Sequence, residues 1–239
     1  YFQPMATKGT DGTDVGTTLT TQGDILYRDG SGLQRLAAGT SGQVLQTGGS
    51  GANPSWGTVS SDYVKLQSYS NMQGASGNYI SFDFSSLFSA TYKHYKLIIN
   101  GMYQGSGSGY QVRGRLNVGG ALKSDSYYKS IATYNDVNSS TGTLSTNRRW
   151  NVDYLTFSWL EDSTQANDTA MEIHFTDPRN TGQRPKFFWK AQGMDNSYLY
   201  RLDGWGMYDG SNNDIQGISF WGDGNTTINF RSAELYGIK

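Results

Sequence analysis

Nine side chains in this 239-residue sequence have types and contexts that suit sugar binding. Six are aromatic residues in polar stretches, and three belong to one Asn- and Asp-rich turn; they are Tyr127, Tyr128, Tyr134, Trp150, Tyr208, Trp221, Asn212, Asn213 and Asp214. Sugar rings stack on aromatic faces, while amide and carboxylate groups bind sugar hydroxyls. We therefore expect these residues to form a glycan-binding tip.

Each of these aromatic residues also has a structural alternative. Its ring can pack in a β core or against another copy of the chain. For Trp205, which stands between Gly204 and Gly206, packing is the favoured interpretation.

The inventory of catalytic groups is small. The sequence has no Cys and only two histidines, His94 and His174, which excludes thiol nucleophiles and cysteine metal sites. His174 lies between Ile173 and Phe175 in an alternating run, so its side chain should point away from their face. Segment 105–109 has glycine where a G-x-S-x-G motif needs serine, and it is typical of a hairpin turn. We predict no catalytic residue, no metal ligand and no cofactor.

Carboxylates leave two further possibilities open. Glu161 and Asp162 offer the carboxyl pair that a glycosidase needs, which keeps a small polysaccharide depolymerase as an alternative. Segments 209–214 and 223–225 are rich in Asp and Asn, as Ca²⁺ sites are, but they lack the EF-hand spacing and its final Glu. Turn formation explains both segments better.

Charge and hydropathy argue against two classes of partner. Nineteen Lys and Arg residues against twenty Asp and Glu residues give a net charge of −1, so we expect no general nucleic-acid binding. Apolar runs such as 97–99 and 187–189 are too short to cross a bilayer, so we expect no membrane insertion.

Composition and alternation predict an all-β fold. The 31 glycines, with Glu at only three of the 20 acidic positions, favour turns over helices. Residues 110–118 alternate between apolar and polar side chains, and about ten short runs of this kind follow residue 62. The same part of the chain holds 29 of the 33 aromatic residues, enough for one core. We expect residues 63–239 to form an antiparallel, jelly-roll-like β-sandwich.

The final run, residues 228–239, changes its apolar parity. Ile228 and Phe230 set one alternation, and Leu235 falls on the other. This change predicts a β-bulge that redirects the last strand.

Residues 5–62 hold too few large apolar side chains to enclose a core. Burying them would not offset an ordering cost of roughly 1–2 kcal/mol per residue, so the segment is either disordered or completed by other chains. Within it, residues 19–29 predict a strand that ends at the turn 29–32, and a partner strand follows. Residues 1–4 resemble the end of a protease-cleavable tag and are left out of the fold.

Residues 21–56 of this segment carry a distinctive sequence pattern, which occurs once in the chain. The pattern is T-x-G-D-I-L-x-R-D-G-S-G-x-x-R-L-x-x-G-x-x-G-Q-V-L, with Trp eleven residues later, and its matching positions are Thr21, Gly23, Asp24, Ile25, Leu26, Arg28, Asp29, Arg35, Leu36, Gly39, Gly42, Gln43, Val44, Leu45 and Trp56. It resembles a segment of bacteriophage tail-fibre and other virion fibre proteins. The resemblance implies a connector inside a homotrimeric fibre, whose trimerisation stem would include Gly23, Asp24, Ile25, Leu26, Arg28, Leu36, Val44, Leu45 and Trp56.

Together these features predict a non-enzymatic fibre or spike protein located in a virion. The glycine-rich extended stem would trimerise and attach to a tail or capsid protein, and the β-sandwich heads would bind a glycan or receptor of the host surface. Two alternatives stay open. One is a capsid decoration or cementing protein whose glycine-rich arm anchors to the shell, and the other is the depolymerase.

Overall fold

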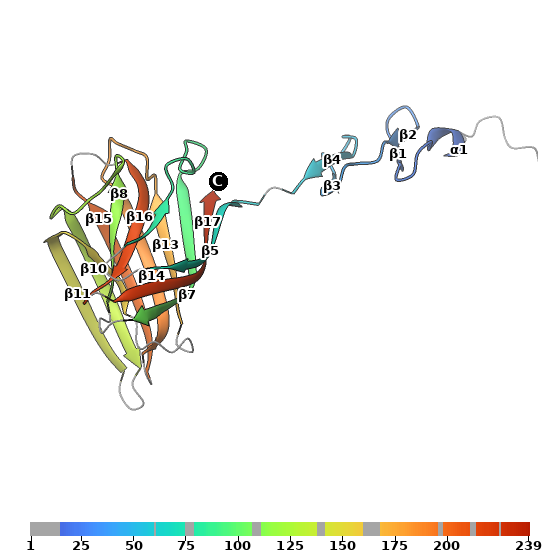
Figure 1. The fold of residues 1–239 in the computed structure, drawn as a ribbon. Helices are drawn as coiled ribbons and strands as arrows, with labels where there is room; N and C mark the ends of the chain where they lie inside the picture. Colours follow the sequence, from blue (N-terminus) through green and yellow to red (C-terminus); the bar gives the residue numbers. More distant parts are fainter. Residues whose placement is uncertain are drawn as a thin grey trace, which may run out of the picture. The chain divides into compact units, whose positions relative to one another are not determined.

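The computed structural model describes most of the chain, and its described residues form two compact units (Figure 1). The described ranges are 15–59, 61–74, 79–106, 111–137, 142–159, 168–195, 198–210, 214–224 and 226–239. Unit 1 spans Tyr1–Ser61 and unit 2 spans Asp62–Lys239, so the division falls where the aromatic content rises. Asn212, Asn213, Glu161 and Asp162 lie outside the described residues, as do residues 1–4.

Unit 1 consists of a four-residue helix and two β-hairpins. Its elements are α1 (Val15–Thr18), β1 (Ile25–Arg28), β2 (Leu33–Leu36), β3 (Gln43–Gln46) and β4 (Ser55–Thr58), with β1 paired to β2 and β3 paired to β4. The Asp29 carboxylate accepts hydrogen bonds from the amides of Ser31 and Gly32, which closes the first hairpin as predicted. The strand before it is shorter than expected because Gly23 has a φ of 89°, which ends the extended chain.

No described apolar residue of unit 1 is buried. Polar contacts order it instead: the indole nitrogen of Trp56 donates to the carbonyl of Ala37 at 2.6 Å, and Arg35 pairs with Asp24 at 2.9 Å. Burial would raise the pKa of Asp24, but hydrogen bonds from the amides of Thr21 and Thr20 and the charge of Arg35 outweigh it and lower that pKa. The prediction that this segment cannot enclose a core by itself is confirmed.

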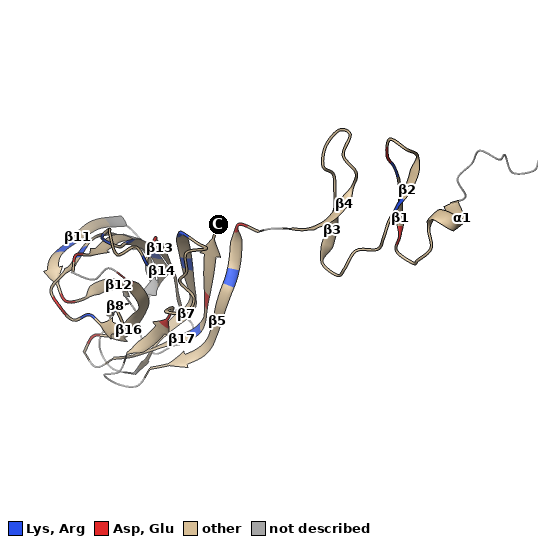
Figure 2. Cartoon of the chain, turned by 90° about the horizontal axis from the view of Figure 1, so that it is seen from above, with Lys and Arg blue, Asp and Glu red and all other residues tan. Residues whose placement is uncertain are grey.

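Unit 2 is an antiparallel β-sandwich of one large and one small sheet. The large sheet runs in the order β11 (Gly142–Val152), β10 (Tyr128–Val137), β15 (Tyr198–Tyr208), β14 (Lys186–Asp195), β13 (Thr169–Thr176), β7 (His94–Ser106), β17 (Thr227–Ile238) and β5 (Tyr63–Gln73). The small sheet runs in the order β12 (Leu155–Trp159), β8 (Gln111–Val118), β16 (Ile215–Gly222) and β6 (Ile80–Asp83), with β9 (Ala121–Leu122) beside β8. Figure 2 shows the large sheet curling around the small one. The predicted all-β sandwich is confirmed.

The chain passes repeatedly between the two sheets, as it does in a jelly roll. One consequence concerns the glycine-serine segment 105–109. Strands β7 and β8 on either side of it belong to different sheets, so the predicted hairpin turn is wrong.

Aromatic side chains from both sheets fill the space between them. Phe157 of the small sheet lies 4.8 Å from Trp189 of the large sheet, and Phe220 lies 5.8 Å from Phe230, each distance joining ring centroids. Strand β8 alternates strictly between buried and half-buried residues, which confirms the pattern predicted for it. These rings fix which face of each large-sheet strand points inward and therefore which face points out.

An interruption of the ladder crosses three neighbouring strands of the large sheet. Arg231 of β17, Gly101 of β7 and Asn71 of β5 are left out of the ladder, and the last two have φ values of 67° and 49°. Along β17 the buried apolar positions are even-numbered before Arg231 and odd-numbered after it. The register itself does not change at Arg231, and the register shift of β17 against β5 lies between Leu235 and Tyr236, where the extra residue is on β5. The predicted change of apolar parity along the last strand is therefore present, but β17 has no extra residue of its own at either point.

Strand glycines make room for the largest core ring, which gives a test of the packing. A Cβ on Gly204 would lie 2.2 Å from the buried ring of Trp189. We expect Gly204→Ala to lower the free energy of unfolding by about 1–3 kcal/mol, because the packed ring has no space to shift. Urea unfolding followed by tryptophan fluorescence measures the change.

The matched control is Gly182→Ala. The atom nearest to its new Cβ would be Oδ1 of Asn180 at 3.3 Å, which is the end of a movable side chain. This variant should stay within about 0.5 kcal/mol of the parent. Equal stability of the two variants would contradict the packing described for Trp189.

Candidate functional site

Two of the predicted sugar-binding aromatics belong to the core. Tyr128 and Tyr208 are buried. The hydroxyl of Tyr128 accepts a hydrogen bond from the amide of Leu116 and donates to the carbonyl of Lys123, and the hydroxyl of Tyr208 donates to Asp125 at 2.9 Å. Burial raises the pKa of both tyrosines. Neither ring offers a face to a sugar, so the sequence-based assignment is corrected for both.

Two more predicted residues are held by neighbours. Trp221 is half-buried, with Tyr79 and Tyr154 against it edge-on and the guanidinium of Arg115 4.9 Å from its ring centroid. Tyr134 is half-buried, with its ring centroid 6.1 Å from that of Tyr200. The structure does not bring these two residues together with the other predicted aromatics in one tip.

The acidic turns are also engaged by side chains of the protein. Asp214 pairs with Arg179 at 2.6 Å, and Asp223 pairs with Arg113 at 3.4 Å. Among the described residues there is no group of three or more His, Cys, Asp or Glu that could hold a metal ion. The charges of these two carboxylates are therefore balanced within the fold.

Trp150 and Tyr127 are the exposed members of the predicted set, at 73% and 49%. A third exposed aromatic residue is Trp205, at 63%, for which packing was expected. The expectation that Trp205 packs in the core of its own chain is therefore wrong. Its neighbours Gly204 and Gly206 lie under the core rings of the large sheet, and strand alternation therefore points Trp205 to the outside.

Trp205 is the centre of a row of side chains on the outer face of the large sheet. The row crosses five adjacent strands through ladder partners, in the order His174, Phe188, Trp205, Ile131 and Arg148. The rings of His174 and Phe188 stack at 4.1 Å between centroids and 12° between planes, and Phe188 and Trp205 follow at 5.1 Å and 35°. The protein thus presents a continuous aromatic strip on a hydrogen-bonded sheet.

A second row lies beside the first, two residues further along each strand. It contains Thr176, Lys186, Met207, Lys129 and Trp150. The ammonium of Lys129 stands 4.5 Å from the ring centroid of Trp150. Residues of these two rows line an open groove of about 720 Å³, which we call the aromatic groove.

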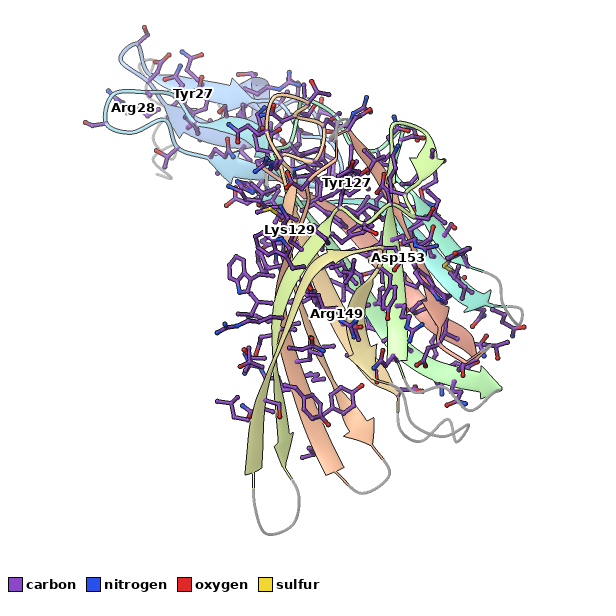
Figure 3. The ribbon with its side chains drawn as sticks, turned by 90° about the vertical axis from the view of Figure 1, so that its left-hand side faces the viewer. Tyr27, Arg28, Tyr127, Lys129, Arg149 and Asp153 are labelled. Carbon is purple, nitrogen blue, oxygen red and sulfur yellow. The ribbon has the colours of Figure 1, made fainter. Side chains whose placement is uncertain are left out.

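Cations surround the aromatic groove. Lys129, Arg148, Arg149, Arg184 and Lys186 line it, and Lys129 and Arg149 are labelled on the neighbouring strands β10 and β11 in Figure 3. None of the described residues that line it is acidic. The groove therefore combines an aromatic floor with positive charge.

Asp209 forms ion pairs with two of these cations. Its carboxylate pairs with both Lys129 and Arg184. The hydrogen bond from Lys129 lowers the pKa of Asp209, and the charge of Arg184 adds to this effect against the opposing effect of burial. Asp209 is therefore an anion that positions Lys129 beside Trp150.

Comparisons with protein-family models, with curated proteins and with solved structures found no match. Among the described helices, none is long and apolar enough to cross a membrane. The geometry of the aromatic groove is thus the basis for assigning a function.

His174 at the end of the aromatic row gives a pH test. Burial lowers its pKa, and the charges of Lys96 and Lys190 add to this, while Glu172, 3.4 Å away, opposes it. The fold thus favours neutral His174, and the resulting stability is lost as the pH falls through the lowered pKa. When the pH is lowered from 7.5 to 5.5, we expect the melting temperature of His174→Gln to fall by less than that of the parent.

The pH range from 5.5 to 7.5 lies above the range in which Glu172 and Asp209 titrate, because the pKa values of both carboxylates are lowered. These two groups therefore stay charged throughout the comparison. Differential scanning calorimetry at the two pH values supplies the comparison. Equal losses in parent and variant would show that His174 is not held neutral.

Proposed function

We propose that this chain is a non-enzymatic attachment protein of a virion fibre. Three copies assemble through unit 1, and unit 2 binds a glycan of the host surface in the aromatic groove. The observation that carries the binding role is the group of three aromatic side chains that line the groove on the outer face of the large sheet: Trp205 and Trp150 are exposed, and Phe188 is half-buried.

The strip has the properties of a sugar platform. Large exposed apolar patches on a folded domain mark interaction sites. The two tryptophans expose most of their surface, and the ladder fixes the spacing of their strands before any ligand arrives. A platform that is already ordered avoids the entropy cost of arranging loops on binding. This arrangement suits the flat apolar face of a sugar ring.

The charge pattern of the groove favours binding over hydrolysis. A glycosidase needs two carboxyl groups flanking the bond that it cleaves. The described lining residues include none, and the adjacent Asp209 is committed to Lys129 and Arg184. We therefore assign the groove a binding role.

The trimeric role rests on unit 1. Its described residues form ordered hairpins without burying one apolar residue, so Ile25, Leu26, Val44 and Leu45 remain available to sister chains. The resemblance of residues 21–56 to virion fibre segments supports the same arrangement. Three linked sites raise the effective concentration of each, so weak individual binding gives firm attachment.

Replacing the central tryptophan tests the glycan-binding role. A glycan array identifies a bound sugar, and calorimetry then compares variants of the chain. We expect Trp205→Ala to weaken binding about tenfold or more, because a central aromatic anchor is lost. Its stability should change by no more than about 1 kcal/mol, because the ring is mainly exposed.

Leu199→Ala is the matched control for Trp205→Ala. Leu199 is an exposed residue of the same strand that does not line the groove. Its variant should bind as the parent does. Parent-like binding by Trp205→Ala would rule out the aromatic groove as the sugar site.

Removing unit 1 tests the assembly. Light scattering of the full chain should give three times the 26.3 kDa chain mass, and residues 62–239 alone should give a monomer. Loss of avidity should weaken attachment to host cells by about 100-fold or more. A monomeric full chain, or a fragment that keeps the trimer mass, would contradict the role of unit 1.

A further inference from the structure

The cations around the aromatic groove are a local excess in a nearly neutral chain. The whole sequence has a net charge of −1, yet five cations and no acid are found among the described lining residues. Stacking of a neutral sugar on the aromatic side chains does not require positive charge. The five cations therefore need a separate explanation.

Three of the five cations have no acidic partner within the described part of the chain, and two of these three, Arg148 and Lys186, are exposed. Lys129 and Arg184 share Asp209, and Arg149 lies 5.3 Å from the ring centroid of Tyr154. Arg148 and Lys186 are exposed, and neither pairs with a described acidic residue. These two side chains can neutralise a ligand without breaking an ion pair.

Arg148 and Lys186 lie at opposite sides of the groove. Lys186 is on β14, two residues from Phe188, and Arg148 is on β11, in line with Trp205 and Ile131. Three strand spacings separate β14 from β11, which amounts to about 14 Å. An oligosaccharide on the aromatic strip would therefore meet a cation at each side.

We infer that the aromatic groove takes an anionic oligosaccharide, with sugar rings on Phe188 and Trp205 and acidic groups on Arg148 and Lys186. The inference rests on the proposed function and narrows its ligand to sugars that carry carboxylate or sulfate groups. The planar guanidinium of Arg148 suits either group through paired hydrogen bonds. Lys186 adds a point charge on the other side.

The same features disfavour two other occupants. A nucleic-acid strand carries a phosphate at every nucleotide, and two exposed cations without an acidic partner match this density poorly. A second copy of this face would bring Arg148 and Lys186 of both copies together, and like charges in contact oppose association. Both occupants remain outcomes of the test.

Calorimetry on the full chain provides that test. The probes are a galacturonate tetramer, a sulfated dextran oligomer and an unmodified dextran oligomer of equal length. We expect the parent to bind at least one anionic probe about tenfold more tightly than the neutral probe. The two anionic probes distinguish carboxylate from sulfate as the recognised group.

The variant Arg148→Gln/Lys186→Gln should bind all three probes with the affinity that the parent shows for the neutral one. Added salt should weaken anionic binding by the parent but leave neutral binding unchanged. Lys190→Gln is the matched control, since Lys190 is an exposed cation of the same strand and face that does not line the groove. It should keep the anionic preference.

The possible failures are distinguishable. Equal affinity of the parent for anionic and neutral probes would overturn this inference and leave the proposed function standing. Failure to bind any sugar, on the array or in solution, would overturn both. Tighter binding of a single-stranded oligonucleotide, or self-association that Trp205→Ala abolishes, would assign the groove to another partner and also overturn the inference.

Discussion

The packing of Trp189 and Phe187 over Gly204 and Gly206 is the constraint on which the site depends. The two core rings occupy the space that side chains at these glycines would fill. Because successive residues of a strand point to opposite faces, the residue between the glycines must point outward. That residue is Trp205, so the same contact that fills the core also exposes the platform.

The outer face then follows from sheet register. Hydrogen-bonded pairing places Phe188 and Ile131 directly beside Trp205 on the adjacent strands, and a shift of one residue would turn either side chain into the core. A binding surface built this way is as rigid as the sheet itself. It differs from a loop-built tip, in which binding has to order the chain.

The sequence alone predicts the fold class and the exposure of Trp150 and Tyr127, but it does not predict that Trp205 and Phe188 meet on the outer face. The alternation of apolar and polar residues identifies the strands. The small number of large apolar residues before residue 62 predicts a unit with no core of its own. The site is harder because exposure depends on strand pairing across long sequence separations. Tyr128 is adjacent to exposed Tyr127 and yet is buried, since it is the first residue of β10 and points inward.

One signal for the missed residue was present in the sequence. Glycines flanking Trp205 in an alternating run place two gaps on one face and a large ring on the other. The neighbouring Phe188 had no comparable signal, because it stands between Phe187 and Trp189 and all three residues are apolar. Only the register with Trp205 shows that its ring belongs to the outer row.

The most direct test of the central claim is the indole N–H spectrum of the tryptophans during titration with a bound sugar. If the outer face of the large sheet is the binding surface, the signals of Trp205 and Trp150 move with ligand concentration and that of buried Trp189 does not. Movement confined to Trp221 or Trp56, with Trp205 and Trp150 unchanged, would contradict the account.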